Sequence, residues 1–437
     1  MLLSLRASLH RIVRRVGVVM KRLAEENTGN RIIFLTVVSV MFLCFGLLLD
    51  RPSGIVSGLW NIVREPDYLI SDYFVIGGPG AAFVNSGLLM LAFTVLLGTI
   101  RTEIRGLSLA AVFTIAGFSF FGKNIANVWF VVAGVWLYAQ VQRRPFVRFL
   151  YVALFGTALS PMVSQIMFGL EGPLVCRVIA GGAVGVAMGF LLPPLSTAML
   201  SFHKGFNLYN IGFTAGLVGT VAISIYRSFG FIPQSRVIWH RGIDPLILAF
   251  LGALFAGILL AGYVAGGKSF RGIREIWGYP GRLLTDFPDL SGYAPTLMNM
   301  GLNGLVFLSY LVAIGGDLNG PTIGGLLTVV GFSALGKTTR NTLPVLFGVV
   351  LGGLTKSWSL QDPPVQLAAL FCTTLAPVAG SFGPLAGVAA GYLHSSVVLH
   401  VGILHAGFNL YNNGFAGGLV AAFLVPLIEA FSGRKDA

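Results

Sequence analysis

The sequence has few charged residues, which make up 10% of its 437 positions, and acids are the scarcest, with 16 Asp and Glu against 29 Lys and Arg. A soluble chain of this length needs more charge to cover its surface. Apolar runs near the length of a bilayer span recur along the whole chain. These features exclude a soluble globular protein and predict an all-α polytopic membrane protein whose main surroundings are the lipid bilayer.

Cysteines and catalytic motifs are also scarce. Cys44, Cys176 and Cys372 lie inside apolar runs, without the spacing of metal ligands or a pattern typical of disulfides. The chain contains no P-loop, HExxH or GxSxG motif, and its many Gly-x-x-x-Gly spacings are typical of helix packing in membranes. We therefore expect no metal, no cofactor and no enzymatic activity.

The net charge of +13 would indicate nucleic-acid binding in a soluble protein. Here the cations gather at the start of the chain and in short loops, as the positive-inside rule expects, so nucleic acid is not an expected partner. Residues 1–30 mix Arg and Lys with Leu and Val, which predicts an amphipathic segment on the cytoplasmic leaflet. We expect a multi-pass protein of the bacterial cytoplasmic (inner) membrane with both termini in the cytoplasm.

Several motifs occur twice in the same order, which indicates two homologous halves. "FTIAGFSFFGKNIAN" at 113–127 matches "LTVVGFSALGKTTRN" at 327–341, and "HKGFNLYNIGFTAGLVG" at 203–219 matches "HAGFNLYNNGFAGGLVA" at 405–421. One separation relates Asn85 to Asn299 and Lys123 to Lys337 (299 − 85 = 337 − 123 = 214). The predicted domains are the cytoplasmic segment 1–30, a first membrane repeat 31–228, a connecting loop 229–244, a second membrane repeat 245–431 and a cytoplasmic tail 432–437.

The first half is predicted to contain spans at about 32–49, 81–100, 148–168, 174–192 and 206–226, with two short arms at about 107–121 and 125–139. A helical arm of that length spans about 22 Å, less than the bilayer core of about 30 Å, so the pair can form a re-entrant hairpin. An odd number of crossings per half makes the halves inverted, with about 10 full spans and two short-helix hairpins in total. The basic segment 227–244, which this arrangement places outside, keeps the parallel alternative open.

Polar residues shared by the two halves are the candidates for a substrate pathway. His203, Asn207 and Asn210 fall at i, i+4 and i+7, which predicts one polar face on a helix, and His405, Asn409 and Asn412 repeat it. Interhelical hydrogen bonding is the alternative interpretation. Lys123 and Lys337 at the hairpin tips, with Asn127 and Asn341, could attract an anion or carboxylate, or could be interfacial lysines.

Two further sets of shared residues have weaker signals. Asp72 and Asp286 could coordinate a cation or couple a proton, but their Ser-Asp and Thr-Asp context also suits a helix cap. Asn85 and Asn299 are each followed by x-Gly-Leu, and a buried Asn there can hold backbone carbonyls at a helix break. Pro161 and Pro377 are expected to end or kink matching spans, where transporters expose backbone groups.

The order of "LISDYFVIGGPGAAFVNSGL", "GFSFFGKN" and the two "GFNLYNxGF" blocks resembles an uncharacterised bacterial family of multi-pass membrane proteins with duplicated halves. That resemblance covers most of the chain and implies the architecture without an activity. A weaker similarity is to urea transporters, which also have two inverted halves and a repeated "GYN"-type segment. Their paired threonine-rich segments have no clear counterpart here, which puts urea itself in doubt.

Together these features predict a transporter or channel for a small polar solute or ion, with its pathway at the interface of the two halves. The alternatives are an intramembrane lipid-modifying enzyme and a structural or receptor subunit of the membrane. A homo-oligomer is compatible with the sequence.

Overall fold

The computed structural model describes residues 28–230, 236–283 and 285–432. Almost all of the predicted segment 1–30, part of the connecting loop 229–244 and most of the tail 432–437 lie outside these residues. Ten helices of the described part are long and apolar enough to cross a membrane. The predicted all-α polytopic membrane fold is therefore confirmed.

The first half consists of α2 (Thr28–Leu49), α3 (Pro52–Arg64), β1 (Ile70–Ser71), α4 (Tyr73–Gly77), α5 (Pro79–Thr99), α6 (Gly106–Phe118), α7 (Val128–Val141), η1 (Phe146–Phe149), α8 (Leu150–Gly156), η2 (Thr157–Leu159), α9 (Ser160–Gly169), α10 (Leu174–Phe202) and α11 (Asn210–Ser228). The second half consists of β2 (Val237–Ile238), α12 (Pro245–Ala265), α13 (Arg271–Ile276), α14 (Phe287–Ser291), α15 (Tyr293–Ala313), α16 (Gly320–Phe332), α17 (Thr339–Thr355), α18 (Pro363–Phe371), η3 (Cys372–Leu375), α19 (Ala376–Phe382), α20 (Pro384–Val401), η4 (Gly402–His405) and α21 (Asn412–Ser432).

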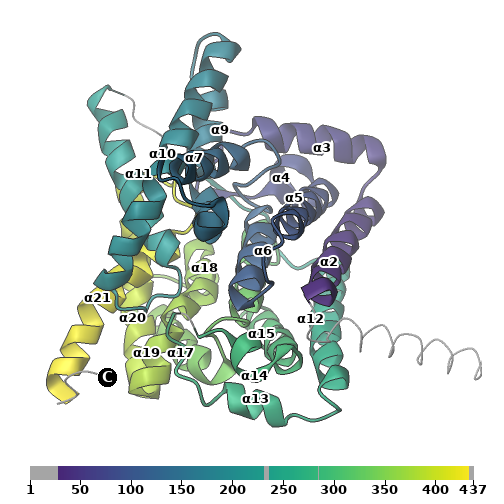
Figure 1. Ribbon diagram of the computed structural model, residues 1–437, viewed down its shortest axis with the longest axis vertical. Helices are drawn as coiled ribbons and strands as arrows, with labels where there is room; N and C mark the ends of the chain where they lie inside the picture. Colours follow the sequence, from purple (N-terminus) through teal and green to yellow (C-terminus); the bar gives the residue numbers. More distant parts are fainter. Residues whose placement is uncertain (1–27, 231–235, 284, 433–437) are drawn as a thin grey trace, which may run out of the picture.

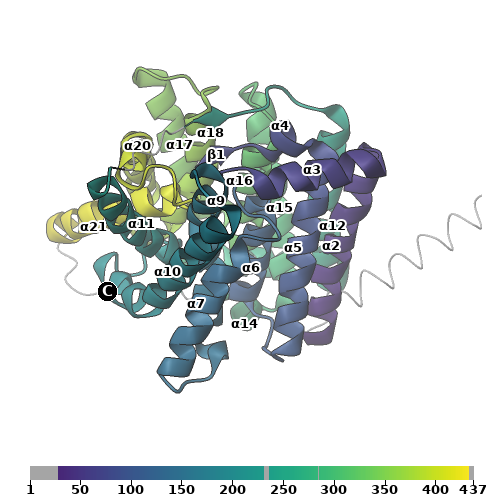
Figure 2. The ribbon, with the colours of Figure 1, turned by 90° about the horizontal axis from the view of Figure 1, so that it is seen from above.

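Long helices pack side by side, and shorter elements lie at their ends. Figure 2 shows α2, α5 and α12 running alongside one another, with α3 across their upper ends and α14 near the lower end. The strongest helix pairs are equivalent in the two halves: α2 with α5 and α12 with α15, then α7 with α10 and α17 with α20. The two halves thus share the packing of their long helices as well as their sequence motifs.

The equivalent helices α6 and α16 pack against each other in opposite directions. Gly106 at the start of α6 lies against Ala334, just after α16 ends, while Gly117 near the end of α6 lies against Gly324 near the start of α16. A Cβ on Gly117 would come within 2.6 Å of the Gly324 carbonyl oxygen, so glycine is what lets the two backbones approach. This antiparallel pair, buried along its whole length, forms the centre of the protein.

Two matching spans are broken where the sequence places proline. The predicted span 148–168 is observed as η1, α8, η2 and α9, with a 3-10 turn immediately before Pro161. Its equivalent is broken by η3 before Pro377. Proline lacks the amide that would bond the preceding turn, so the break leaves carbonyls free. Loops of the opposite half use them: Leu410 donates its amide to Ala158 O at 3.1 Å and Leu208 to Thr374 O at 3.0 Å.

The prediction of a helix starting near 206, with His203, Asn207 and Asn210 on one face, is wrong. α11 starts only at Asn210, and residues 203–209 form an irregular loop. Lys204 and Gly205 have φ of 51° and 78°, in the left-handed region that ends a helix. Asn207 then accepts the Tyr209 amide on its own side chain, which competes with helical bonding. The second copy does the same with Ala406 and Gly407, and α21 starts at Asn412.

Candidate functional site

The two GFNLYN loops, residues 203–209 and 405–411, are each bonded to the first turns of the other half's last helix. Asn207 Nδ2 donates to the Gly414 carbonyl at 2.9 Å, and Asn409 Nδ2 donates to the Gly212 carbonyl at 3.2 Å. Asn207 Oδ1 also accepts from Thr374 Oγ1 at 2.5 Å. Both asparagines are fully buried, and their bonds position the loops.

The histidines of the same loops bond within their own half. One ring nitrogen of His203 lies 2.9 Å from Asn210 Oδ1, and His405 lies 2.9 Å from Asn412 Oδ1. Each of these asparagines also donates to a carbonyl of the preceding long helix. These pairs close each loop onto its helix and do not form the polar stripe expected from the spacing.

The hairpin tips, residues 119–127 and 333–341, are held by asparagines from the neighbouring spans. Asn85 Nδ2 donates to the carbonyls of Ser119 and Lys123 at 2.6 and 2.9 Å. Asn299 repeats this with Ser333 and Lys337 at 2.7 and 2.7 Å. The amide therefore fixes each tip by satisfying two carbonyls that leave the helix unpaired.

Asn127 and Asn341 also belong to the tips, and each bonds within its own turn. Asn127 Oδ1 accepts the Asn124 amide at 2.9 Å and Asn341 Oδ1 accepts the Thr338 amide at 2.8 Å. Their Nδ2 atoms reach the carbonyls of Gly122 and Gly336 at 3.1 and 2.9 Å. They shape the turn that presents each lysine.

Each tip lysine reaches across to a tyrosine of the opposite half. Lys123 Nζ donates to Tyr411 Oη at 2.7 Å, and Lys337 Nζ donates to Tyr209 Oη at 2.5 Å. Both lysines are completely buried. The tyrosines come from the GFNLYN loops, so the most strongly repeated sequence in the chain meets the hairpin tip of the other half.

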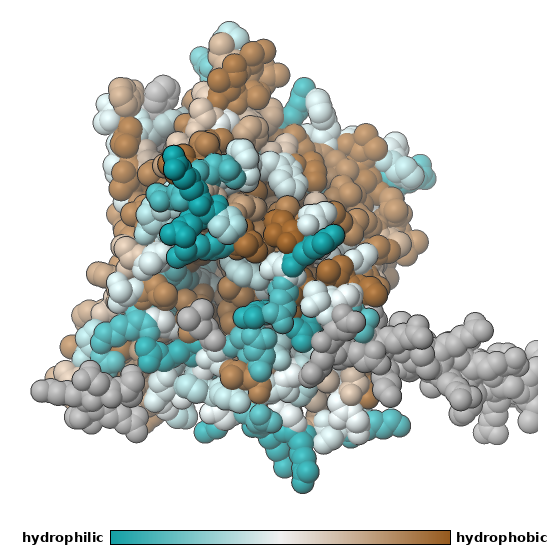
Figure 3. Space-filling model, in the orientation of Figure 1, coloured by the Kyte–Doolittle hydropathy of each residue, from teal (hydrophilic) through white to brown (hydrophobic). Residues whose placement is uncertain are grey.

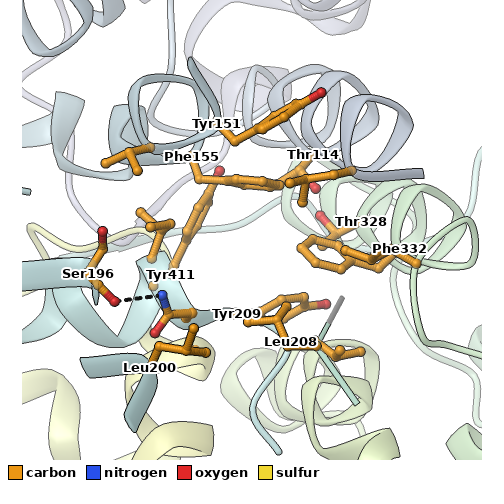
Figure 4. Close-up of a pocket in the computed structure, with 18 of the residues that line it drawn as sticks. Thr114, Tyr151, Phe155, Ser196, Leu200, Leu208, Tyr209, Thr328, Phe332 and Tyr411 are labelled. Atoms are coloured by element: carbon orange, nitrogen blue, oxygen red, sulfur yellow. Dashed lines mark hydrogen bonds between the residues drawn. The ribbon is translucent and has the colours of Figure 1, made fainter. Parts of the chain in front are cut away.

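Six aromatic side chains surround the space beside these pairs, and they form three equivalent couples from the two halves. We call this set the aromatic cage: Phe118 and Phe332, Phe155 and Phe371, Tyr209 and Tyr411. Neighbouring rings lie with centroids 4.5 to 6.4 Å apart, from Tyr411 with Phe118 to Tyr209 with Phe371. Figure 4 shows Phe155, Tyr209, Phe332 and Tyr411 facing a common space.

That space is a cavity of about 650 Å³ between the halves. Its inner end is lined by the aromatic cage and by Thr114 and Thr328, and its outer end by Arg105, Arg148, Asp286 and Asp289. Figure 4 shows Ser196 and Leu200 of α10 along one side. Figure 3, in the orientation of Figure 1, shows hydrophilic residues gathered over the middle and lower parts of the molecule, beside hydrophobic residues above and to the right.

Acids at the cavity mouth are already bonded. Asp286 accepts the amides of Gly106 and Leu107 at 3.0 and 3.3 Å, so it caps α6, a helix of the other half. Burial raises the pKa of the Asp286 carboxyl. Asp289 pairs with Arg105 at 3.5 Å. Arg148 forms no ion pair with any described residue, so a free cation stands at the entrance.

The start of α16 is equivalent to the start of α6 at the cavity mouth, but other residues cover it. Asp72 caps α16 by accepting the Gly320 amide at 3.1 Å, the counterpart of the bond that Asp286 makes. It also accepts the His240 amide at 2.9 Å, and β2 pairs in parallel with β1 there. Burial raises the pKa of Asp72 to about 6, against three backbone amides that lower it. The segment between the halves thus covers Asp72, the counterpart of the Asp286 that lines the cavity mouth.

Of the residues singled out in the sequence, Asn210 and Asp286 line the cavity, and the others do not. The aromatic cage was missed, although its signal was present. Tyr209 and Tyr411 stand in "GFNLYN", and Phe118 and Phe332 stand in "GFS", so both couples are identical in the two copies. A search restricted to shared polar residues passes over them.

Asp67 was missed for the opposite reason, since it has no counterpart. It is fully buried and accepts from Tyr73 Oη at 3.0 Å and Asn127 Nδ2 at 3.3 Å. Burial raises the pKa of this carboxyl to about 8. Gly281 and Phe287 occupy the equivalent positions of the second half, so comparing the halves could not select it.

Within the described part of the chain, no group of three His, Cys, Asp or Glu side chains is placed to hold a metal ion. The donors that line the cavity are hydroxyls, the side-chain amides of Asn210 and Asn413, and the guanidinium groups of Arg105 and Arg148. Such a set can bind a polar solute or an anion without a bound cofactor.

Comparison with known proteins gives one match. The family described as a protein of unknown function, DUF1576, matches residues 51–228 and 266–430, which are the two homologous halves. No curated protein and no solved structure matches the chain, and the similarity to urea transporters is not supported. The chain is a multi-pass membrane protein that belongs to the DUF1576 family.

Proposed function

We propose that the protein carries a small polar solute or ion across the membrane, through the interface of two inverted halves. The observation that supports this most is the cavity. It lies between the halves, it is lined by equivalent residues of both, and its inner end reaches buried polar groups at the centre of the protein. Binding sites at the interface of repeats are the usual arrangement in transporters with duplicated halves.

The inverted arrangement draws support from the packing of α6 against α16. Their antiparallel contact is what a two-fold axis in the membrane plane produces. Five spanning helices and one short-helix hairpin per half give an odd number of crossings. The hairpin of each half then enters from a different side of the membrane, and their tips approach the aromatic cage from opposite directions.

We infer from the basic loops that the cavity mouth faces the cytoplasm. Arg105 and Arg148 line the mouth, and Arg143 and Arg144 precede η1 near it in the sequence. Cytoplasmic loops carry the excess of Lys and Arg in membrane proteins. The bacterial inner membrane and the cytoplasmic termini follow as part of the same proposal.

A flux screen in liposomes tests the proposal. The full chain is reconstituted and assayed with urea, small amides, small carboxylates and common inorganic ions. Thr197→Trp, on the cavity side of α10, should reduce the flux of the transported class at least about tenfold by filling the mouth. Leu191→Trp is the matched control, because Leu191 lies on the same helix, is exposed and does not line the cavity.

Absence of flux for every class, in protein shown to be folded, would count against transport. Equal flux for the Thr197 and Leu191 variants would count against the cavity as the pathway and leave transport standing. Turnover of a phospholipid in the same liposomes would favour the alternative of an intramembrane lipid-modifying enzyme.

A further inference from the structure

Two buried lysines stand behind the tyrosines that line the inner end of the cavity, and no acid of the described residues neutralises them. Lys123 and Lys337 are fully buried, and in the described residues each Nζ has a tyrosine hydroxyl as its single hydrogen-bond partner. No ion pair of the described chain includes either of them. An ammonium has three donors, and a buried charge is costly unless it is paired and hydrogen-bonded. The protein therefore lacks a negative charge at this position.

We propose that the inner end of the cavity binds a small monovalent anion between Tyr209 and Tyr411. This inference rests on the proposed transport function and names the class of its substrate. Each lysine donates to a phenolic oxygen, so that hydroxyl's own proton can point toward another acceptor. Thr373 lies within hydrogen-bonding reach of the Tyr209 hydroxyl, whereas the Tyr411 hydroxyl has no second partner among the described residues. The Tyr411 proton is therefore free for an anion in the cavity, and the Tyr209 proton is shared with Thr373.

The aromatic and apolar lining of the cavity favours some anions over others. Ring edges carry the positive part of the aromatic quadrupole, so an anion can lie against the edges of the aromatic cage. The cavity is lined mainly by apolar groups, in which a weakly hydrated monovalent anion such as nitrate or formate loses less hydration than sulfate. Sulfate and phosphate are therefore expected to bind poorly.

A third donor stands beside the cage. Thr114 lines the cavity, is 2% exposed, and its Oγ1 has no hydrogen-bond partner in the described structure. Its equivalent Thr328 is instead bonded to the Gly324 carbonyl at 2.8 Å. Figure 4 shows Thr114 and Thr328 on the side of the cavity occupied by Phe332. A buried hydroxyl without a partner is what a site prepared for a ligand leaves open.

The charged residues at the cavity mouth also favour a negatively charged ligand. Arg148 has no acidic partner in the described structure, and Asp289 is paired with Arg105. Asp286 is held by two amides of α6. The negative groups at the mouth are thus partly neutralised, while one cation remains free to attract an anion.

Binding can be measured on the full chain in detergent by isothermal titration with sodium nitrate, sodium formate and sodium sulfate, with urea as a neutral comparison. We expect nitrate and formate to bind and sulfate to bind at least about tenfold more weakly, because its two charges must be desolvated. Flux of nitrate and formate into liposomes is measured in parallel.

The decisive variant replaces Lys123 by Met and Tyr411 by Phe together. This change keeps the volume and the ring but removes the ammonium and the hydroxyl as a pair, so no buried group loses its partner. We expect anion affinity to fall at least about tenfold, the range of a lost charge-assisted hydrogen bond. Lys268→Met, an exposed lysine away from the cavity, is the control and should bind as the unmodified protein does.

The outcomes separate this inference from the proposed function. Flux of a neutral solute without binding or flux of any anion would overturn the anion site and leave transport standing. Anion binding that is lost in the double variant supports the site, even if no flux is found. Equal affinity of the double variant and the Lys268 control would overturn it.

Discussion

The hairpin tip depends on two hydrogen bonds from one amide, and Asn299→Leu removes both. Asn299 Nδ2 donates to the carbonyls of Ser333 and Lys337 at 2.7 and 2.7 Å in a fully buried site. Leu is close to Asn in size, so the main loss is polar. A buried acceptor left without its donor costs roughly 1–3 kcal/mol, so we expect the free energy of unfolding to fall by about 2–5 kcal/mol.

Unfolding of the detergent-solubilised protein measures that loss, and hydrogen exchange over residues 333–341 shows whether it falls on the tip. Thr296→Val is the matched control, one turn before Asn299 on α15 and equally buried. Thr296 Oγ1 donates at 2.8 Å to the Gly292 carbonyl at the start of its own helix, so its loss should stay within about 1 kcal/mol. Equal destabilisation by the two variants, or unchanged exchange at the tip, would refute the assignment.

Two further predictions concern packing and protonation. Gly117→Ala places a Cβ 2.6 Å from the Gly324 carbonyl oxygen and should destabilise the protein by about 1–3 kcal/mol. Gly252→Ala in α12, where a Cβ meets nothing within 4 Å, should be neutral or stabilising in the same thermal unfolding assay, and the reverse order would contradict the α6–α16 approach. Asp67 has its pKa raised from 3.8 to about 8 by burial, so it binds a proton in the folded state where the unfolded chain does not. Stability should therefore fall as the pH rises from about 4 to about 8, by at most about 1.4 kcal/mol per pH unit from this group. Asp67→Asn should remove that slope, and an unchanged dependence of Tm on pH would show that Asp67 is ionised throughout.

Much of the fold follows from the sequence because it depends on local signals. Apolar runs near 20 residues predict spans wherever they occur, and the observed helices α2, α5 and α10 begin within a few residues of the predicted starts. The short arms were also predicted, since their length is visible in the sequence. The loops at the two GFNLYN segments were not predicted, because Lys204 and Ala406 have positive φ although their residue types rarely adopt it.

The site was predictable only in part, because its contacts join the two halves. Lys123 meets Tyr411 and Lys337 meets Tyr209, partners separated by most of a repeat or more. The lysines could be identified because they occur in both halves, but their sequence positions do not indicate which tyrosine each one contacts. The aromatic cage likewise depends on how α6 and α16 cross, which is a property of the assembled halves.

Each half caps a central helix of the other half, and this exchange suggests how such a chain could have arisen. Asp72 caps α16 and Asp286 caps α6, so each half supplies what the other half lacks. A contact in which one surface meets its own copy is isologous, and two separate copies can form it as readily as one fused chain. In the inverted arrangement proposed above, a single ancestral repeat inserted in both orientations could have closed the same core as an antiparallel homodimer. The two copies now differ, because the connecting segment bonds Asp72 through the His240 amide and because Gly281 stands opposite Asp67.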